Sequence, residues 1–269
     1  MSEDAVLHPV EVDLLCTFAE VEAPFPLEIP SFGSTDAERA LLFQGARAQL
    51  MERGLADAEG PVGLADEFVH LLRFGNGVLD LVVAQEKTTV GACVLVDRTS
   101  ALIVVQRAEE ETGSVLLRQL SLDDAVDELM RIIPRLDPAG IAPFTLPRRA
   151  LQLAFDALTA SLPTEDGVQP VQLDPGQVEE IFARYGVDDR VSRRMVQYLQ
   201  PVWGNGQAGV AVRSNGAEEE WQRVGDEVRW LDTPHGRFQL AGDSEWMSVN
   251  PLAPDETRAA LRKLAAHLR

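Results

Sequence analysis

The residue types that most often carry chemistry are few in this chain and widely spaced. Its four histidines and two cysteines share no spacing that metal sites use, and no histidine lies in an H-E-x-x-H arrangement. The sequence has no G-x-S-x-G turn, no G-x-x-x-x-G-K-[ST] loop and no short carboxylate and histidine cluster that would activate a nucleophile. We therefore predict no catalytic residue, no metal and no cofactor.

One glycine-rich segment imitates a dinucleotide-binding site. Residues 204–209, Gly-Asn-Gly-Gln-Ala-Gly, match the pattern G-x-G-x-x-G. The dinucleotide-binding version follows a strand and opens a helix, which points backbone N–H groups at the pyrophosphate. This segment follows a predicted helix and opens a predicted strand, so we interpret its glycines as a tight turn at positive φ.

Two acidic runs, Glu109–Glu111 and Glu218–Glu220, could imitate paired catalytic carboxylates. Consecutive glutamates at strand edges are usually solvated and discourage edge-to-edge pairing, and we favour that interpretation. An enzyme with a shallow acidic cleft stays open as an alternative. Cys16 and Cys93 lie in apolar runs, which indicates buried free thiols.

Composition narrows the class of partner. The 269 residues are 45% hydrophobic and carry a formal net charge of −19. Nucleic acids and anionic membranes are bound by lysine and arginine, so this balance argues against both. The acidic N-terminus lacks a secretory signal, and no apolar run is long enough to span a membrane, which predicts a cytoplasmic protein.

The elements that would position a site are organised around a repeat. Phe74-Gly75-Asn76-Gly77 and Trp203-Gly204-Asn205-Gly206 lie 129 positions apart, each after an amphipathic helix and before an apolar strand. Both halves of the chain then pass through further strands and end in a helix. This order predicts a duplicated architecture, which favours a scaffold or binding protein over an enzyme.

In the first half, apolar periodicity and turn residues predict one antiparallel meander between helices. The predicted strands are Val10–Phe18, Val78–Gln85, Val90–Val96, Ala101–Gln106 and Ser114–Leu120, and the predicted helices are Thr35–Arg53, Leu64–Arg73 and Asp123–Ile133.

The second half follows a proline-rich connection, Pro134–Pro147. Helices are predicted at Arg148–Leu162, Asp174–Tyr185, Asp188–Tyr198 and from Pro254, and strands at Ala208–Arg213, Glu218–Val224, Glu227–Thr233, Gly236–Leu240 and Glu245–Val249. Trp221, Trp230 and Trp246 would then lie in three of these strands, as core residues or as anchors of a binding face.

The residue types of one segment near the C-terminus predict a tight turn. In Asp232-Thr233-Pro234-His235-Gly236-Arg237, proline suits an early turn position and Gly236 a conformation closed to larger residues. Asp232 and Thr233 can hydrogen-bond the turn backbone. We predict that Arg237 pairs with Asp232 in a structural role.

The same residues carry a family resemblance. Residues 230–238, Trp-Leu-Asp-Thr-Pro-His-Gly-Arg-Phe, followed by residues 246–251, Trp-Met-Ser-Val-Asn-Pro, and a closing helix, resemble the C-terminal signature of the EspG family. These proteins are associated with ESX, or type VII, secretion in actinobacteria. Phe238 stands where the family more often has tyrosine.

The resemblance implies an α+β fold: a central, largely antiparallel β-sheet flanked by helical bundles. It implies one domain over residues 1–269, built from halves 1–143 and 144–269 related by a pseudo-two-fold axis. It also implies a cytosolic chaperone without enzymatic activity, which binds a PE–PPE heterodimer at the apolar tip of the PPE subunit, keeps it soluble and directs it to one ESX system.

Contact residues do not follow from a family motif, so we place them by architecture. The predicted partner-binding residues are one loop between long strands and three residues of the second-half sheet: Gln85, Glu86, Lys87, Thr88, Arg213, Glu219 and Trp221. The net charge would favour a partner with a basic rim. A general adaptor for another helical partner stays open as an alternative, as does a homodimer.

Overall fold

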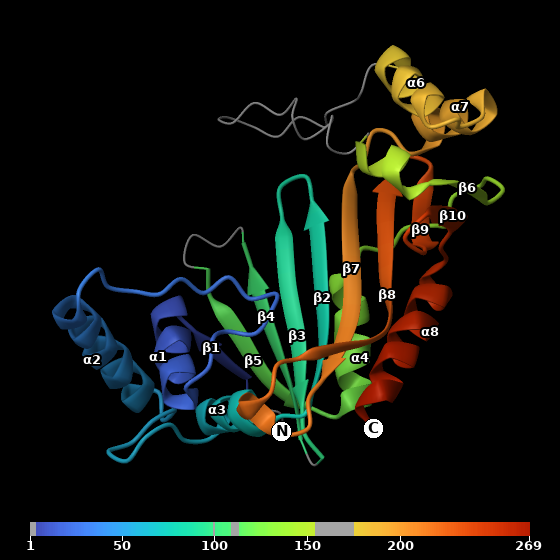
Figure 1. Cartoon of the computed structure of the whole chain (residues 1–269). Coiled ribbons are helices and arrows are strands. Elements are labelled where there is room, and N and C mark those ends of the chain that lie inside the picture. The colour runs from blue at the N-terminus through green and yellow to red at the C-terminus, as the bar shows by residue number, and fades with distance from the viewer. Residues whose placement is uncertain (1–3, 99, 109–112, 154–174) are drawn as a thin grey trace.

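The computed structural model describes residues 4–98, 100–108, 113–153 and 175–269. Its centre is a ten-stranded sheet with the order β1-β5-β4-β3-β2-β7-β8-β9-β10-β6, with helices on both faces (Figure 1). Every neighbouring pair of strands is antiparallel. The predicted α+β class and the antiparallel sheet are therefore confirmed.

The first half of the chain supplies one side of the sheet and four helices. Its elements are β1 (Asp4–Leu7), α1 (Pro9–Ala19), α2 (Asp36–Glu52), α3 (Leu64–Phe74), β2 (Gly77–Gln85), β3 (Thr89–Val96), β4 (Ala101–Arg107), β5 (Val115–Leu120) and α4 (Leu122–Ile132). The meander predicted from Val78 to Leu120 is present.

The second half supplies the other side of the sheet. Its elements are β6 (Phe144–Pro147), α6 (Pro175–Arg184), α7 (Asp189–Tyr198), β7 (Gly204–Val212), η1 (Gly216–Glu218), β8 (Gln222–Thr233), β9 (Gly236–Gly242), β10 (Trp246–Pro251), α8 (Pro254–Ala265) and η2 (Ala266–Leu268). Strands β2 and β7 join the two sides, with Gly77 opposite Val212 and Gln85 opposite Gly204.

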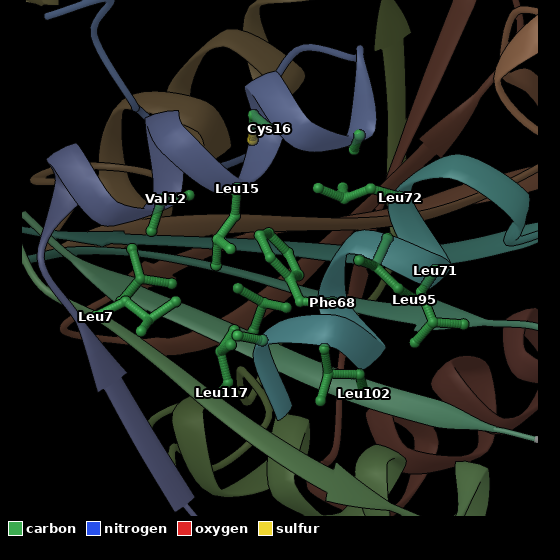
Figure 2. Packing of buried hydrophobic residues seen from close by; sticks show 14 of the residues in the cluster. Leu7, Val12, Leu15, Cys16, Phe68, Leu71, Leu72, Leu95, Leu102 and Leu117 are labelled. Atoms are coloured by element: carbon green, nitrogen blue, oxygen red, sulfur yellow. The ribbon is translucent and has the colours of Figure 1, made fainter. Parts of the chain in front are cut away.

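Successive side chains of each strand point to opposite faces of the sheet, and a separate hydrophobic core lies on each face. On one face, Phe68 of α3 and Leu15 of α1 pack over Leu95 and Leu117 (Figure 2). On the other face, neighbouring residues such as Val94 pack beneath α4 and α8. A third cluster joins α6 and α7 to β6, β9 and β10 through buried side chains that include Phe182, Met195 and Phe238.

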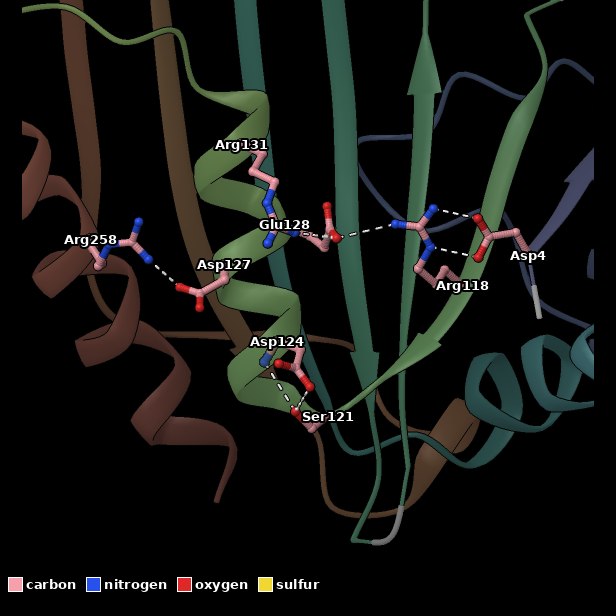
Figure 3. A network of polar contacts seen from close by, with 8 residues as sticks. All are labelled: Asp4, Arg118, Ser121, Asp124, Asp127, Glu128, Arg131 and Arg258. Carbon is pink, nitrogen blue, oxygen red and sulfur yellow. Dashed lines mark hydrogen bonds and ion pairs between the residues drawn. The ribbon is translucent and has the colours of Figure 1, made fainter. Parts of the chain in front are cut away.

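Ion pairs hold α4 between its neighbours (Figure 3). Glu128 of α4 accepts from Arg118 of β5 (3.3 Å), and Arg118 also pairs with Asp4 of β1. On the other side, Asp127 of α4 pairs with Arg258 of α8. These partly exposed pairs contribute little energy each, and they fix the helix above the sheet.

The predicted strand Val10–Phe18 is wrong, because this segment is helix α1. His8 caps the helix with its ring nitrogen, Glu11 completes a capping box and Pro9 occupies the first turn. A short continuous apolar run fits a buried helix as well as a buried strand, so the cap was the deciding signal.

Two predicted strands of the second half are one strand. Residues 222–233 form β8 without a turn, and the register to β7 shifts between Ala208 and Val210. Gly225, at φ +68, lies in this bulge, between the two strands that were predicted. Trp221 therefore precedes β8 while Trp230 lies within it, and Glu218 belongs to η1.

The remaining differences lie around the connection between the halves. Pro134–Pro147 is predicted to be irregular, yet its end forms edge strand β6, which pairs with β10. Residues 148–153 are helical as predicted. The rest of the Arg148–Leu162 helix, the Asp174 cap and the Glu109–Glu111 run lie outside the described residues.

Candidate partner-binding site

The two Gly-Asn-Gly segments form the junctions at opposite ends of the β2 and β7 pair. Their glycines do not adopt positive φ, so the predicted positive-φ turn is wrong. They allow close approach instead: a Cβ on Gly75 would lie 2.3 Å from the Leu71 carbonyl oxygen, and one on Gly204 would lie 2.8 Å from that of Ala84. The dinucleotide-like segment opens strand β7, as predicted.

At one end of the β2 and β7 pair, here named the closed end, the Arg213 side chain is buried, beside a surface cavity of about 790 Å³ that Asn76, Val212 and Ser214 also line. As a whole residue, Arg213 is 7% exposed. Its Nε donates to the Gly75 carbonyl oxygen (2.8 Å) and its Nη2 to that of Leu72 (2.6 Å). The Trp221 ring lies 4.0 Å from the guanidinium carbon. Arg213 therefore ties β7 to the C-terminus of α3, and burial lowers its pKa.

Glu219 also makes local contacts at this end. Its carboxylate accepts from the backbone N–H of Ser214 (3.0 Å) and from the side chain of Asn215 (3.3 Å). Glu218, Glu219 and Glu220 are all exposed, as their solvated interpretation predicts. Trp221 packs against the core beneath α1 and α3.

The other end of the β2 and β7 pair is open. The hairpin between β2 and β3 closes through Gln85 and Thr88, whose backbone groups bond in both directions (2.7 and 3.3 Å). A cavity of about 750 Å³ lies between this hairpin and the segment that enters β7. It is lined by Ala84, Gln85, Glu86, Lys87, Thr88, Thr89, Ala108, Val202, Trp203, Gly204 and Asn205.

Trp203 is the large apolar side chain of the open end. Its backbone N–H donates to the Asp232 carbonyl oxygen (2.8 Å), which fixes its position beside β8. Its side chain is 51% exposed. A tryptophan whose backbone is held in place and which is half exposed to water is typical of a binding anchor. From the sequence, Trp203 was assigned only to the repeat and not to the binding residues. Its position outside any predicted strand was the signal that could have indicated an exposed side chain.

The predicted binding residues therefore lie in two groups, at opposite ends of the β2 and β7 pair. The hairpin residues 85–88 lie at the end of β2 that pairs with Gly204, whereas Arg213 follows the residue that pairs with Gly77. Nine residues of strand separate these ends by about 27 Å. The hairpin lines one cavity. Arg213, Glu219 and Trp221 lie next to β7, η1 and β8 at the closed end, where Arg213 lines another cavity.

The buried titratable groups outside the two ends of the strand pair contribute to the structure of the protein and line neither end. Asp80 lies buried in β2, opposite Gly209 of β7, and pairs with Arg223. Burial raises the pKa of the Asp80 carboxyl to about 6, against the lowering effect of Arg223. Burial also raises the pKa of the Cys16 thiol to about 12, and raises that of Cys93 further. Both cysteines are free and buried, as predicted.

The signature turn has the predicted ion pair. Arg237 Nε and Nη2 each lie 2.7 Å from an oxygen of Asp232, and both side chains are buried. Arg237 Nη2 also donates to the Pro134 carbonyl oxygen (3.0 Å), which ties the connection between halves to β9. Gly236 has φ +114, and Thr233 Oγ1 hydrogen-bonds within the turn.

Two kinds of feature are absent from the described ranges. None of the helices there combines the length and the apolar run needed to cross a bilayer. In those same ranges, no three His, Cys, Asp or Glu side chains come close enough together to hold a metal ion.

Comparison with known proteins identifies a similar fold and a protein family. No curated protein matches the sequence. A chain in the solved structure of the Mycobacterium tuberculosis type VII secretion system chaperone EspG5 in complex with a PE25–PPE41 dimer is similar in fold. The TM-score is 0.67 at 10% identity, covering 97% of this chain and 95% of that chain. A family model for the EspG family matches residues 8–263. The chain therefore belongs to the EspG family.

Proposed function

We propose that this chain is a cytoplasmic, non-enzymatic chaperone that binds a PE–PPE heterodimer and directs it to a type VII secretion system. The observation that carries the proposal is the family match over residues 8–263. The similar fold of a structure that contains EspG5 with a PE25–PPE41 dimer supports it. A general adaptor for another helical partner is the alternative.

The proposed fold has one domain, residues 1–269, with halves 1–143 and 144–269 related by a pseudo-two-fold axis. The strand order supports this, because β2-β3-β4-β5-β1 and β7-β8-β9-β10-β6 run outward in the same sequence from the two central strands. The helix positions support it too: α4 and α8, each last in its half, share one core.

We place the client at the open end of the sheet, on the hairpin and Trp203. An exposed apolar tip favours self-association, and covering it removes apolar surface from water at about 25 cal/mol per Å². Trp203 supplies apolar surface on the chaperone side, and the cavity provides shape. The client would thus be kept soluble by the surface that recognises it.

The first experiment is co-expression of the chain with each PE–PPE pair of the source genome, followed by affinity capture and size-exclusion chromatography. We expect one ternary complex that co-elutes, from a pair that aggregates when expressed alone. If every pair stays soluble alone and none co-elutes, the chaperone proposal is wrong and the adaptor alternative gains.

A second experiment tests the hairpin. Exchanging its two charges, Glu86→Lys with Lys87→Glu, keeps the net charge and is expected to weaken binding at least fivefold without lowering the melting temperature. The matched control exchanges two exposed charges elsewhere, Glu22→Lys with Lys263→Glu, and should bind like the parent chain. Equal binding by both variants would place the client elsewhere.

A further inference from the structure

At each end of the β2 and β7 pair, the asparagine of a Gly-Asn-Gly segment lies opposite a residue of the other strand. The side chains of these two opposite residues differ. At the closed end, the Arg213 backbone N–H donates to the carbonyl oxygen of Asn76 (3.0 Å). At the open end, Ala84 lies opposite Asn205. Asn76 and Asn205 are the asparagines of the two Gly-Asn-Gly segments. Ala84 therefore occupies the position at the open end that Arg213 occupies at the closed end.

The closed end shows what fills such a position. The Arg213 guanidinium lies between two carbonyl oxygens and the face of Trp221, with its charge buried. Among its described neighbours no carboxylate contacts it, so carbonyl dipoles and an aromatic ring hold the cation. This geometry suits a planar guanidinium better than the compact ammonium of lysine.

The position at Ala84 has no such side chain, and the cavity beside it offers contacts that differ from those of Arg213. Ala84 ends at Cβ, and the cavity of about 750 Å³ lies against it. The half-exposed Trp203 ring lines this cavity. Glu86 and Lys87 are the charged residues of its lining, both exposed on the hairpin. The carboxylate of Glu86 can pair with a cation that stacks on Trp203.

We propose that this cavity accepts an arginine side chain of the client, stacked on Trp203 and facing Glu86. The inference rests on the proposed function, because it names the group by which the client enters the open end. The net charge of −19 favours the approach of a basic residue. The client arginine would fill the position beside Ala84 that Arg213 fills at the closed end.

The test is to fill the position from within the chain. Ala84→Arg should weaken binding of the PE–PPE pair at least tenfold and leave the melting temperature unchanged. The matched control, Ala241→Arg, changes another half-buried strand alanine that lines a different cavity and should bind normally. Unchanged binding by Ala84→Arg overturns the inference, whereas loss of binding by the parent chain itself would count against the proposed function.

A double-mutant cycle identifies the client group. Each arginine at the tip of the pair is replaced by alanine and assayed against the parent chain and Ala84→Arg. One replacement should weaken binding to the parent at least tenfold and have no further effect on Ala84→Arg. Losses that add fully for every arginine overturn the inference.

A probe that needs no client decides the chemistry independently. The Trp203 indole N–H is followed by nuclear magnetic resonance during titration with N-acetylarginine amide, N-acetyllysine amide and N-acetylleucine amide. Its signal should move with the arginine amide alone and stay fixed in Ala84→Arg. An equal response to all three amides, or none to arginine, rejects the arginine site even if the chaperone proposal holds.

Discussion

Asp80 is a buried carboxylate whose ionisation opposes folding. Its pKa is raised to about 6 from an ordinary value of 3.8, so the folded state binds the proton more tightly than the unfolded state. The cost of the ionised form is complete above pH 6 and disappears as the pH falls toward 4. A shift of this size corresponds to about 3 kcal/mol.

We therefore expect Asp80→Asn to raise the free energy of unfolding by up to about 3 kcal/mol at pH 7.5 and to change it little at pH 4. Denaturant titration of both proteins at the two pH values measures the difference. Arg223 loses its partner in this variant, but it is half-exposed and can be solvated. A loss of stability at pH 7.5 would mean that the ion pair outweighs the burial.

The buried Arg237 and Asp232 pair should behave in the opposite way. Arg237→Met leaves the Asp232 carboxylate buried without its partner, at an expected cost of about 3–5 kcal/mol. Replacing both residues, with Asp232→Leu added, should restore most of that stability because no uncompensated charge remains. Arg229→Met removes an arginine that is 42% exposed beside Glu227, so this control should cost less than about 1 kcal/mol. Urea denaturation distinguishes the three variants.

At the scale of the element, glycines differ in the space around them. Substitution by alanine should therefore change the stability of the protein in opposite directions at different glycines. A Cβ on Gly206 would lie 2.0 Å from the buried Trp230 ring, so Gly206→Ala must displace that ring and should cost about 1–3 kcal/mol. Gly45, inside helix α2, has nothing within 4 Å of such an atom. Gly45→Ala should stabilise the protein by about 0.5–1 kcal/mol. Thermal unfolding of both variants gives the comparison, and a stable Gly206→Ala would show that Trp230 repacks.

The sequence predicts elements best where one signal dominates. Helices α3 and α8 follow from apolar periodicity, because one face of each is buried. Strands β2 to β5 follow from apolar runs rich in Val, Leu and Ile with short connections, because the sheet there has a core on both faces. Helix α1 is missed because its apolar run is buried too evenly to show a period. Strand β8 is divided in the prediction because Gly225-Asp226 has turn composition, and whether glycine makes a turn or a bulge depends on the partner strand β7.

The candidate site shows the same limit at the scale of the whole molecule. Short-range composition indicates the hairpin 85–88, but only the long-range register places it beside Trp203 and away from Arg213. Arg213 in particular has the exposure and contacts of a core residue. Net charge is equally uninformative about location, because the lining of the open cavity has one acidic and one basic residue.

The pairing of β2 with β7 also makes a prediction about the two halves. Residues 1–143 alone would expose the β2 edge and the side of α4 that packs with α8, and residues 144–269 alone would expose β7. We expect each fragment to be insoluble or to self-associate when expressed alone. Co-expressed fragments should instead form a one-to-one complex with the circular dichroism spectrum of the intact chain, since the connection near residue 143 adds only local constraint. A fragment that is monomeric and cooperatively folded on its own would show that the halves are independent domains, and the proposal of a single domain would then be wrong.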